Sequence, residues 1–495
     1  MLSILLSCVV IYRYRRRKVF ALAKKLKCDF AKWPILGHSY VFIGNGEDRM
    51  NVFKSLALQA LNKGGLTSFW LVDKLFVVAV DAVDIEIITK TCLNKDDIMR
   101  GFSNLIGNGT FVAPVPIWRR RRKYLMPSFS PKKMVDYAGT FVKQSRIMAD
   151  LLEKNVVERT DIAIFDYICG YTLDSICETS LGMSLAVQGN QRHPFLTALL
   201  DICELSAAAF CQPWLRIRGV SKLMSTYEKS HRCRKVLRET VEEVIYYNTY
   251  YLLENSKDLI TFSDGKYKTF LDMLIESSGG ERGYSDLELR EEALVLTLAG
   301  TDTSASSASF TLLMLARHHD VQQKVYEELQ EVFGDSTRLP DACDLAKLKY
   351  LDAVIRETMR LYPPGPVIVR KVENDLVLPS GVTLVAGVGV LINIWGLHRN
   401  RLYWGDDADV FRPERFLEPL KHPAAFMAFS YGPRNCPGYQ FAMMAIKTSL
   451  TAILLRYRVL PCQYEGTCDK QEELRVKFDI TMKHVDDFKV KLEKR

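Results

Sequence analysis

One ten-residue stretch, residues 429–438, constrains this chain more than any other. It reads Phe-Ser-Tyr-Gly-Pro-Arg-Asn-Cys-Pro-Gly and runs into an uninterrupted helical pattern over residues 439–456. Cys436 thus lies at a loop–helix junction, where free backbone N–H groups and the positive end of the helix dipole favour a thiolate. Pro437 suits the first helical position, and Gly432 permits a turn with positive φ before the sulfur.

Two further residues of this stretch suit a bound, flat, acidic group. Gly438 leaves room for a bulky cofactor against the backbone, and Arg434 places a guanidinium group two residues before Cys436, suited to a carboxylate. The alternative is a buried cysteine in a turn, because a free cysteine usually behaves as a small hydrophobic residue. The combination of specified positions favours a holder for a soft metal through sulfur, with a clamp for acid groups.

The positions Phe429, Gly432, Arg434, Cys436 and Gly438 resemble the haem-binding loop of cytochrome P-450 enzymes, F-x-x-G-x-R-x-C-x-G. The resemblance implies that Cys436 binds the iron of haem b as a thiolate. It also implies that Phe429, Arg434 and Gly438 contact the cofactor. In that family, the thiolate pushes electron density toward the iron and favours O–O cleavage.

The composition describes a folded chain with no recognisable nucleotide site of its own. The 495 residues are 48% hydrophobic and 25% charged, with a net charge of +9 and no internal repeat. Twelve cysteines occur without a C-x-x-C motif, so we expect reduced thiols in a cytosol-facing protein. Neither G-x-G-x-x-G nor G-x-x-x-x-G-K-[ST] is present. Electrons for a redox reaction are therefore expected from another protein, and no nucleic-acid partner is expected.

The first thirty residues suggest a membrane anchor. Residues 1–12 are apolar apart from two serines, and five cations follow within residues 13–18. Twelve residues fall short of the roughly 20 that a straight spanning helix needs. No small-residue cleavage site follows, and the charges lie on the wrong side for a signal peptide. We expect residues 1–30 to form a short or interfacial anchor with a cytosolic basic linker, the alternative being a buried helix start.

The remaining residues, 31–495, are expected to form a single catalytic domain that is mainly α with small β-sheets. Its folded part is expected to start near Trp33. Aromatic and β-branched residues over 67–80 predict a hairpin around Asp73 and Lys74. Residues 378–390 have strand character with turns at residues 379–381, and residues 479–492 also have strand character. Most of the stretch from 131 to 251 has helical periodicity.

A long buried helix is predicted after residue 284. Residues 285–288 form a capping box, and from 293 to 316 the only charge is Asp302, among many serines and threonines. A buried carboxylate is costly without a partner or a role, and Gly300 in mid-helix costs about 1 kcal/mol relative to Ala. The alternative to a catalytic role is that Thr303 bonds to a carbonyl one turn earlier and Asp302 pairs with an arginine.

Residues 299–304, Ala-Gly-Thr-Asp-Thr-Ser, resemble the oxygen-activation motif of the same family, [AG]-G-x-[DE]-T-[TS]. The resemblance implies that Thr303 hydrogen-bonds the bound dioxygen and that Asp302 relays protons, which makes these two the catalytic residues. It also implies that Gly300 leaves space over the iron.

Glu357 and Arg360 lie three residues apart in a helical segment, and Arg415 follows in Pro-Glu-Arg-Phe. Such pairs alone are commonly exposed and contribute a few tenths of a kcal/mol. Together they resemble the E-x-x-R helix and the later P-E-R-F segment of the family. The resemblance implies a buried salt-bridge network on the thiolate side that fixes the fold and takes no part in the chemistry.

Five consecutive cations over residues 119–123 follow Trp118, and a run like this is usually a solvated face. The surrounding W-x-x-R-R-K-x-L-x-P-x-F pattern resembles the helix beside the haem edge. It implies that Trp118 and Arg122 hold the propionates, together with Arg434 and Arg370. The other cations of the run would then face an acidic redox partner.

These matches span about residues 30 to 490 and imply a cytochrome P-450 fold with a long central helix over the haem. The details are similar to microsomal, insect-type members related to the fatty-acid ω-hydroxylases. The implied reaction inserts one oxygen atom of O₂ into a hydrophobic small molecule, which is a lipid, hormone or xenobiotic. Electrons would come from NADPH through NADPH–cytochrome P-450 reductase, with cytochrome b5 as a second partner. The implied location is the endoplasmic reticulum membrane, with the catalytic domain in the cytosol.

One departure bears on the substrate and the cofactor. Many fatty-acid hydroxylases of this group carry, at the position of Ala299, a glutamate that esterifies haem; we therefore expect haem bound without a covalent link to the porphyrin. A haem-thiolate isomerase or dehydratase, needing neither O₂ nor a reductase, is an alternative that the retained Asp302 and Thr303 argue against. A non-catalytic haem-dependent sensor is another, and no recognisable signalling domain supports it.

Overall fold

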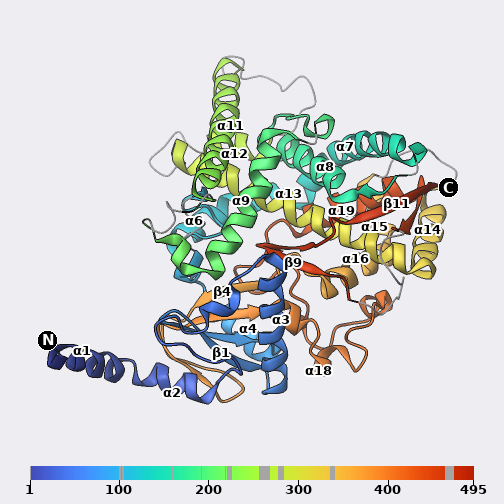
Figure 1. Ribbon diagram of the computed structural model, residues 1–495. Helices are drawn as coiled ribbons and strands as arrows, with labels where there is room; N and C mark the ends of the chain where they lie inside the picture. Colours follow the sequence, from blue (N-terminus) through green and yellow to red (C-terminus); the bar gives the residue numbers. More distant parts are fainter. Residues whose placement is uncertain are drawn as a thin grey trace.

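The computed structural model describes residues 2–99, 102, 105–158, 160–190, 192–217, 219, 224, 226–255, 268–276, 284–334, 341–462 and 473–495. Within these residues the chain is mostly helical with small sheets, which confirms the predicted fold class. A helix-rich part and a sheet-rich part lie against each other, and the chain termini lie far apart (Figure 1).

The described helices are α1 (Leu2–Arg15), α2 (Arg17–Lys25), α3 (Gly46–Asn62), α4 (Ala82–Thr91), α6 (Val115–Leu125), α7 (Pro131–Glu158), α8 (Ile164–Ile176), α9 (Pro194–Cys211), α11 (Thr226–Asn255), α12 (Phe270–Glu276), α13 (Asp286–Arg317), α14 (His319–Phe333), α15 (Ala342–Lys347), α16 (Lys349–Leu361), α17 (Ile394–Leu397), α18 (Arg401–Trp404) and α19 (Tyr439–Leu454). The described strands are β1 (Leu66–Leu71), β2 (Lys74–Ala79), β3 (Ile162–Ala163), β4 (Val367–Lys371), β5 (Leu376–Val377), β6 (Thr383–Leu384), β7 (Gly389–Asn393), β8 (Tyr457–Pro461), β9 (Val476–Asp479), β10 (Thr481–His484) and β11 (Lys489–Lys494).

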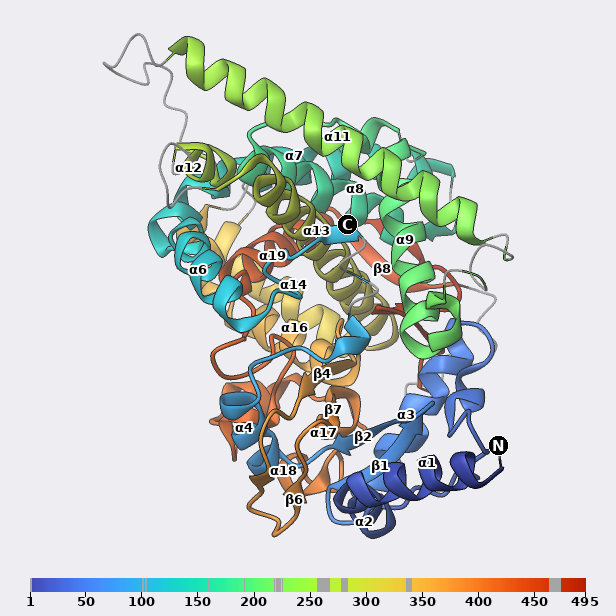
Figure 2. The same cartoon turned by 90° about the vertical axis from the view of Figure 1, so that its left-hand side faces the viewer.

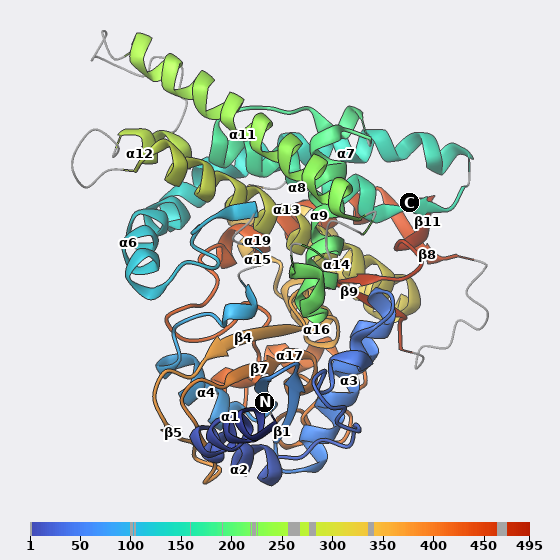
Figure 3. The ribbon, with the colours of Figure 1, turned by 60° about the vertical axis from the view of Figure 1, so that its left-hand side comes forward.

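The sheet-rich part is built on a sheet in the order β1-β2-β7-β4, seen in the lower half of Figure 3. The predicted hairpin is present, because β1 and β2 are antiparallel and Leu71 lies opposite Lys74. Strand character with a turn at residues 379–381 was predicted over residues 378–390, and that turn is present. Gly381 has a positive φ between β5 and β6, and a second positive φ at Gly387 precedes β7.

The predicted central helix is α13, which runs through the middle of the helix-rich part under α11 (Figure 2). It starts at the predicted capping box, where the Ser285 side chain accepts from the Glu288 amide and the Glu288 side chain accepts from the Ser285 amide. The helix packs against α8, α16 and α19, and nearly all of its side chains beyond Leu289 are buried. A helix packed in this way holds its few accessible residues in fixed positions.

The amino-terminal segment differs from expectation, because the folded part begins before residue 31. Val19 and Leu22 of α2 are buried in the core of the sheet-rich part, and the Phe20 ring lies 5.4 Å from the Trp70 ring. Arg16 donates to the carbonyl of Asp73 at 2.6 Å. The supposed linker is amphipathic, so its apolar side covers the sheet, while α1 extends away from the body (Figure 1).

Among the described helices, α9 is the one long and apolar enough to cross a membrane. Half of that helix is buried inside the protein.

Candidate active site

The loop that carries Cys436 is a compact turn closed by backbone hydrogen bonds. The Cys436 amide donates to the Phe429 carbonyl at 2.9 Å, and Gly432 has a φ of 75°, as its position before the sulfur requires. The prediction that Pro437 occupies the first helical position is wrong. The turn continues to Gly438, which caps the helix, so α19 begins at Tyr439.

The Cys436 thiol is accessible to solvent but lies deep among protein atoms. Burial raises its pKa above the ordinary value, while the Gly438 amide and the Arg122 guanidinium lower it. The loop–helix junction therefore does not by itself favour the thiolate as strongly as the sequence suggested. A bound metal cation would supply the remaining stabilisation, because thiol ligands must lose their proton to bind.

Helix α6 contacts this loop through the two residues that the sequence singled out. Trp118 is buried, and the Arg434 guanidinium lies over its ring at 4.5 Å. Arg122 donates to the carbonyl and to the side-chain oxygen of Asn435, next to Cys436. Trp118, Arg122 and Arg434 therefore come together beside the cysteine loop.

Two buried guanidinium groups in this region lack partners for some of their donors. Arg370 is fully buried with Nε and Nη2 unpaired, and Arg434 has Nε and Nη1 unpaired, although its Nη2 donates to the Ala113 carbonyl. Burial lowers the pKa of both side chains, and Arg370 lowers the pKa of Arg434 further. Lys95 lies near both, since burial and then these two arginines lower its pKa well below the ordinary value.

In the part of the chain that the structure describes, no carboxylate pairs with Lys95, Arg370 or Arg434. Unpaired buried cations are costly, so a bound anionic group would stabilise the buried Arg370 and Arg434 and the half-buried Lys95. The residues present thus fit haem, with its two acid groups against the cations and its iron at Cys436. Sequence analysis missed Lys95, because nothing local marks a residue that meets Arg370 only through the tertiary fold.

On the central helix, accessible residues gather within two turns. Ala299 is exposed and Leu298, Gly300 and Thr303 are half-buried, whereas the helix around them is buried. Ala299 and Thr303 lie four residues apart and so share a face. The Thr303 hydroxyl donates to the Ala299 carbonyl at 2.7 Å, which is the back-bonded arrangement weighed against a catalytic role.

Gly300 has a packing role that the sequence did not predict. A Cβ added there would lie 3.0 Å from Cδ1 of Ile176, at the end of α8. The missing side chain therefore lets α13 and α8 pack closely. The small side chain that is accessible on this turn belongs to Ala299.

Asp302 is buried and held by two residues of β10. Its Oδ2 accepts from the Thr481 hydroxyl, and its Oδ1 lies 3.1 Å from Nζ of Lys483. The partner is thus a lysine, and the alternative of a partner arginine is wrong. Burial by itself lowers the pKa of Lys483, but Asp302 together with Cys203, Cys169 and Asp479 outweighs burial and raises it above the ordinary value.

Sequence analysis missed Thr481 and Lys483. Their spacing of two residues places them on one face of a strand, and a lysine on the inward face of an apolar strand was the available signal.

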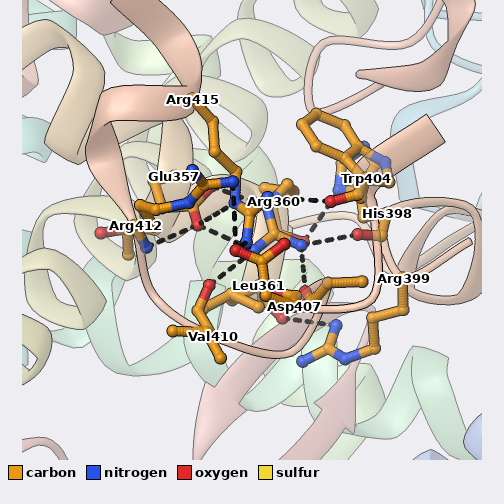
Figure 4. Close-up of polar contacts among 12 residues, drawn as sticks. Glu357, Arg360, Leu361, His398, Arg399, Trp404, Asp407, Val410, Arg412 and Arg415 are labelled. Carbon is orange, nitrogen blue, oxygen red and sulfur yellow. Dashed lines mark hydrogen bonds and ion pairs between the residues drawn. The ribbon is translucent and has the colours of Figure 1, made fainter. Parts of the chain in front are cut away.

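Glu357, Arg360 and Arg415 meet in the interior (Figure 4). Arg360 donates from Nε and Nη2 to the two oxygens of Glu357, at 2.6 and 2.8 Å, and Arg415 donates to Oε1 at 3.3 Å. Arg360 also donates to the carbonyls of His398 and Val410. Every N–H donor of the Arg360 guanidinium binds an acceptor in the interior, so the pair holds several loops in one arrangement.

His398 joins this network to the cysteine loop, and sequence analysis did not find it. Its Nδ1 lies 3.0 Å from the Arg360 carbonyl, and its Nε2 lies 2.8 Å from the Met427 amide. An acceptor on one side and a donor on the other define a neutral ring with the proton on Nδ1. Burial, followed by the Arg360 charge, lowers the pKa of His398 to about 3.

The cations of α6 do not all face outward. Arg119, Arg120 and Lys123 are exposed, and Arg120 pairs with Glu288. Arg121 is buried and bound to carboxylates of α13, so the expectation that it faces a redox partner is wrong. The signal was in the sequence, because Arg121 lies three residues after the buried Trp118 and therefore shares its face.

Comparison of the sequence with known proteins identifies its family. A model of the family described as Cytochrome P450 matches residues 30–486. Cytochrome P450 4d2 of Drosophila melanogaster is 30% identical over 441 residues, covering 86% of this chain and 87% of the relative. Human Cytochrome P450 4V2 is 28% identical over 481 residues, covering 94% and 88%. The chain therefore belongs to the cytochrome P450 family of haem-thiolate monooxygenases.

Proposed function

We propose that this enzyme inserts one oxygen atom into a hydrophobic small molecule, a lipid, hormone or xenobiotic, with electrons that NADPH supplies through a separate reductase. The observation that supports this proposal most is the short accessible stretch on the otherwise buried α13, with Ala299 and Thr303 on one face. Apart from the threonine hydroxyl, this stretch offers apolar surface to a substrate.

The proposed roles around the cofactor follow from the contacts. Cys436 is the iron ligand, and the cations Arg122, Arg370, Arg434 and Lys95 hold the two acid groups. Trp118, stacked under Arg434, holds that guanidinium in place, while Phe429 and Gly438 border the porphyrin. When bound, haem supplies the redox chemistry that activates O₂. The ionic network of Glu357, Arg360 and Arg415 holds the cysteine loop rigid.

The proposed catalytic residues are Thr303 and Asp302. The Thr303 hydroxyl is accessible, and a rotation about χ1 would exchange its bond to the Ala299 carbonyl for a bond to the reacting molecule. Asp302 lies 3.1 Å from Nζ of Lys483 and next to Thr303 in the helix, where it accepts and returns protons. Because Thr481 and Lys483 hold both of its oxygens, proton transfer requires that one of these contacts opens.

We also propose partners and a location. NADPH–cytochrome P-450 reductase, and cytochrome b5 as a second donor, dock on the exposed cations Arg119 and Lys123 of α6. Within residues 1–30, α1 attaches the chain to the endoplasmic reticulum membrane while α2 packs on the sheet, and residues 31–495 act as a single catalytic domain in the cytosol. The apolar residues 1–12 and the cations that follow within residues 13–18 favour this orientation.

The test is turnover of the full chain reconstituted with haem, reductase, NADPH and lipid under isotopically heavy dioxygen. Fatty acids, terpenoids and insecticides form the substrate panel, and mass spectrometry identifies the products. We expect products that carry one heavy oxygen atom and depend on reductase, and none from Cys436→Ser. Conversion that proceeds without O₂ and reductase would instead identify an isomerase or dehydratase.

A further inference from the structure

A buried ionic cluster joins α6 to the first turns of α13. The Arg121 side chain is 2% exposed, and its Nη2 donates to Glu291 Oε2 at 2.7 Å and to Glu288 Oε1 at 3.2 Å. Its Nη1 donates to Glu292 Oε1 at 3.0 Å. Glu291 and Glu292 are also buried. One guanidinium group and two buried carboxylates thus bind each other at a single contact between α6 and α13.

The same carboxylates hold the loop before α6, residues 107–113. The Asn108 amide donates to Glu291 Oε1 and the Thr110 amide to Glu292 Oε1, each at 2.9 Å. Arg121 Nη1 in turn donates to the Asn108 carbonyl at 2.8 Å. Both partners of the ion pair therefore also serve as hydrogen-bond partners of the loop backbone.

The loop approaches α13 so closely that only glycine fits at one position. Gly107 has a φ of 53°, and a Cβ there would lie 1.8 Å from Glu291 Oε1. Gly109 is similarly close, since its Cβ would lie 2.4 Å from Cγ2 of Val295. Two glycines in three residues thus allow the backbone to reach the carboxylates.

The neighbours of Arg121 contact the cysteine loop. Arg122 donates to Asn435, Trp118 lies under the Arg434 guanidinium, and the far end of the 107–113 loop accepts from Arg434 through the Ala113 carbonyl. Successive helical residues point about 100° apart, so Arg121 and Arg122 bind different parts of the protein from one short helix. Helix α6 is therefore tied to α13 on one side and to the cysteine loop on the other.

We propose that Arg121 is a positioning residue that fixes α6 and the 107–113 loop to α13 and so holds Trp118 and Arg122 where they retain haem. Arg121 itself touches neither the cofactor nor the cysteine loop in the contacts described. Its effect on haem is exerted through the orientation of the helix that carries Trp118 and Arg122.

The experiment compares Arg121→Met with Arg119→Met in the full-length haem-loaded protein. Arg119 lies on the same helix but is exposed. Haem loss is followed as transfer to apomyoglobin, and hydrogen exchange is read at the Asn108 and Thr110 amides. For Arg121→Met we expect haem loss to be about ten- to a hundredfold faster, as when residues that orient metal-site ligands are removed, and faster exchange at both amides. Arg119→Met should match the parent in both measurements.

Two further variants separate positioning from general stability. Gly107→Ala keeps every charge but forces Glu291 away, so it should also make haem loss faster. If Arg121→Met does not fold, Gly107→Ala tests the proposal in its place. Leu329→Ala, in the core of α14, lowers stability without touching α6 and should leave haem loss at the parental rate. Parental haem retention in both Arg121→Met and Gly107→Ala, or equal loss in Leu329→Ala, would overturn the proposal.

Discussion

Asp302 and Lys483 form an ion pair in the protein interior, with Oδ1 and Nζ 3.1 Å apart and the side chains 2% and 10% exposed. One residue belongs to the central helix and the other to β10, 181 positions later in the chain. The pair fixes the hairpin of β9 and β10 against the helix turn that carries Thr303. A group expected to move protons is thus also a structural anchor.

Removal of the lysine alone should destabilise the protein more than removal of both charges. Lys483→Met leaves the Asp302 carboxylate buried with only the Thr481 hydroxyl, and breaking such a pair costs about 3–5 kcal/mol of unfolding free energy. Lys483→Met combined with Asp302→Asn should recover most of this loss. Urea unfolding of the parent and of these two variants at pH 7 measures the loss, and a double variant no more stable than the single one would contradict the pairing.

Removal of the Thr303 hydroxyl should change the fate of electrons and leave binding intact. Thr303→Ala removes the one accessible hydroxyl of the Ala299–Thr303 face, so more of the NADPH consumed should end as hydrogen peroxide. Product and peroxide per NADPH are measured with the best substrate of the panel. Asp302→Asn should slow NADPH consumption as well. If both variants form as much product per NADPH as the wild type, Thr303 has no catalytic role and only its hydrogen bond to the Ala299 carbonyl remains.

Acid should destabilise the protein through His398. Its pKa is about 3 in the folded protein, against about 6.5 for an unperturbed histidine, so the unfolded chain binds one more proton between these values. The stability that His398 contributes is complete above about pH 6.5 and falls by about 1.4 kcal/mol per unit as pH drops toward 3.

The measurement is urea unfolding of the parent and of His398→Gln between pH 4 and pH 8. The glutamine variant should be less stable at pH 7, because it loses the geometry of the bonds to Arg360 and Met427. Its stability should also fall less steeply with acid than that of the parent. Parallel profiles for the two proteins would show that His398 does not titrate in this way.

The features that could be predicted from the sequence are those written in local spacing. The capping box at Ser285 starts α13, and the turn residues around Asp73 place the hairpin, because in each case neighbouring residues decide the outcome. Cys436 stands out for the same reason. The environment of Cys436 could not be predicted, because burial and the Arg122 charge depend on parts of the chain hundreds of residues away.

Two of the features that the sequence did not reveal share one cause, which is that a side chain's direction depends on what packs against it. Gly300 faces Ile176 of α8, and Arg121 faces Glu291 of α13, although a motif and a run of charges suggested otherwise. Lys95 carries no signal in its own neighbourhood, and only the fold brings it to the buried arginines.

Salt should slow reductase-driven turnover if the exposed cations of α6 dock the electron donor. Electrostatic association falls steeply with ionic strength, whereas turnover driven by added peroxide needs no docking and should not change. Arg119→Glu and Lys123→Glu should imitate high salt. Arg232→Glu, an exposed cation on α11, is the matched control and should have no effect. Equal salt sensitivity of both kinds of turnover would count against docking at α6.

Haem should be released intact from this protein. The related hydroxylases that esterify haem carry a glutamate at the position of Ala299, whose methyl group has no nucleophile. The next carboxylate, Asp302, lies about 300° around the helix axis and is held by Thr481 and Lys483. Haem is then held only by the Cys436–iron bond, the cations around its acid groups and apolar packing.

Acid–organic extraction should therefore yield unmodified haem, and intact-mass analysis should show bare polypeptide. Ala299→Glu is the positive control, because it places a carboxylate on the accessible face of α13, and a fraction of its haem should stay with the chain after turnover. Haem that remains with the parent protein, or that leaves it carrying a hydroxymethyl group, would contradict this prediction. Such a result would mean that Asp302 or another carboxylate reaches the porphyrin, which in turn would require the Asp302–Lys483 pair to open.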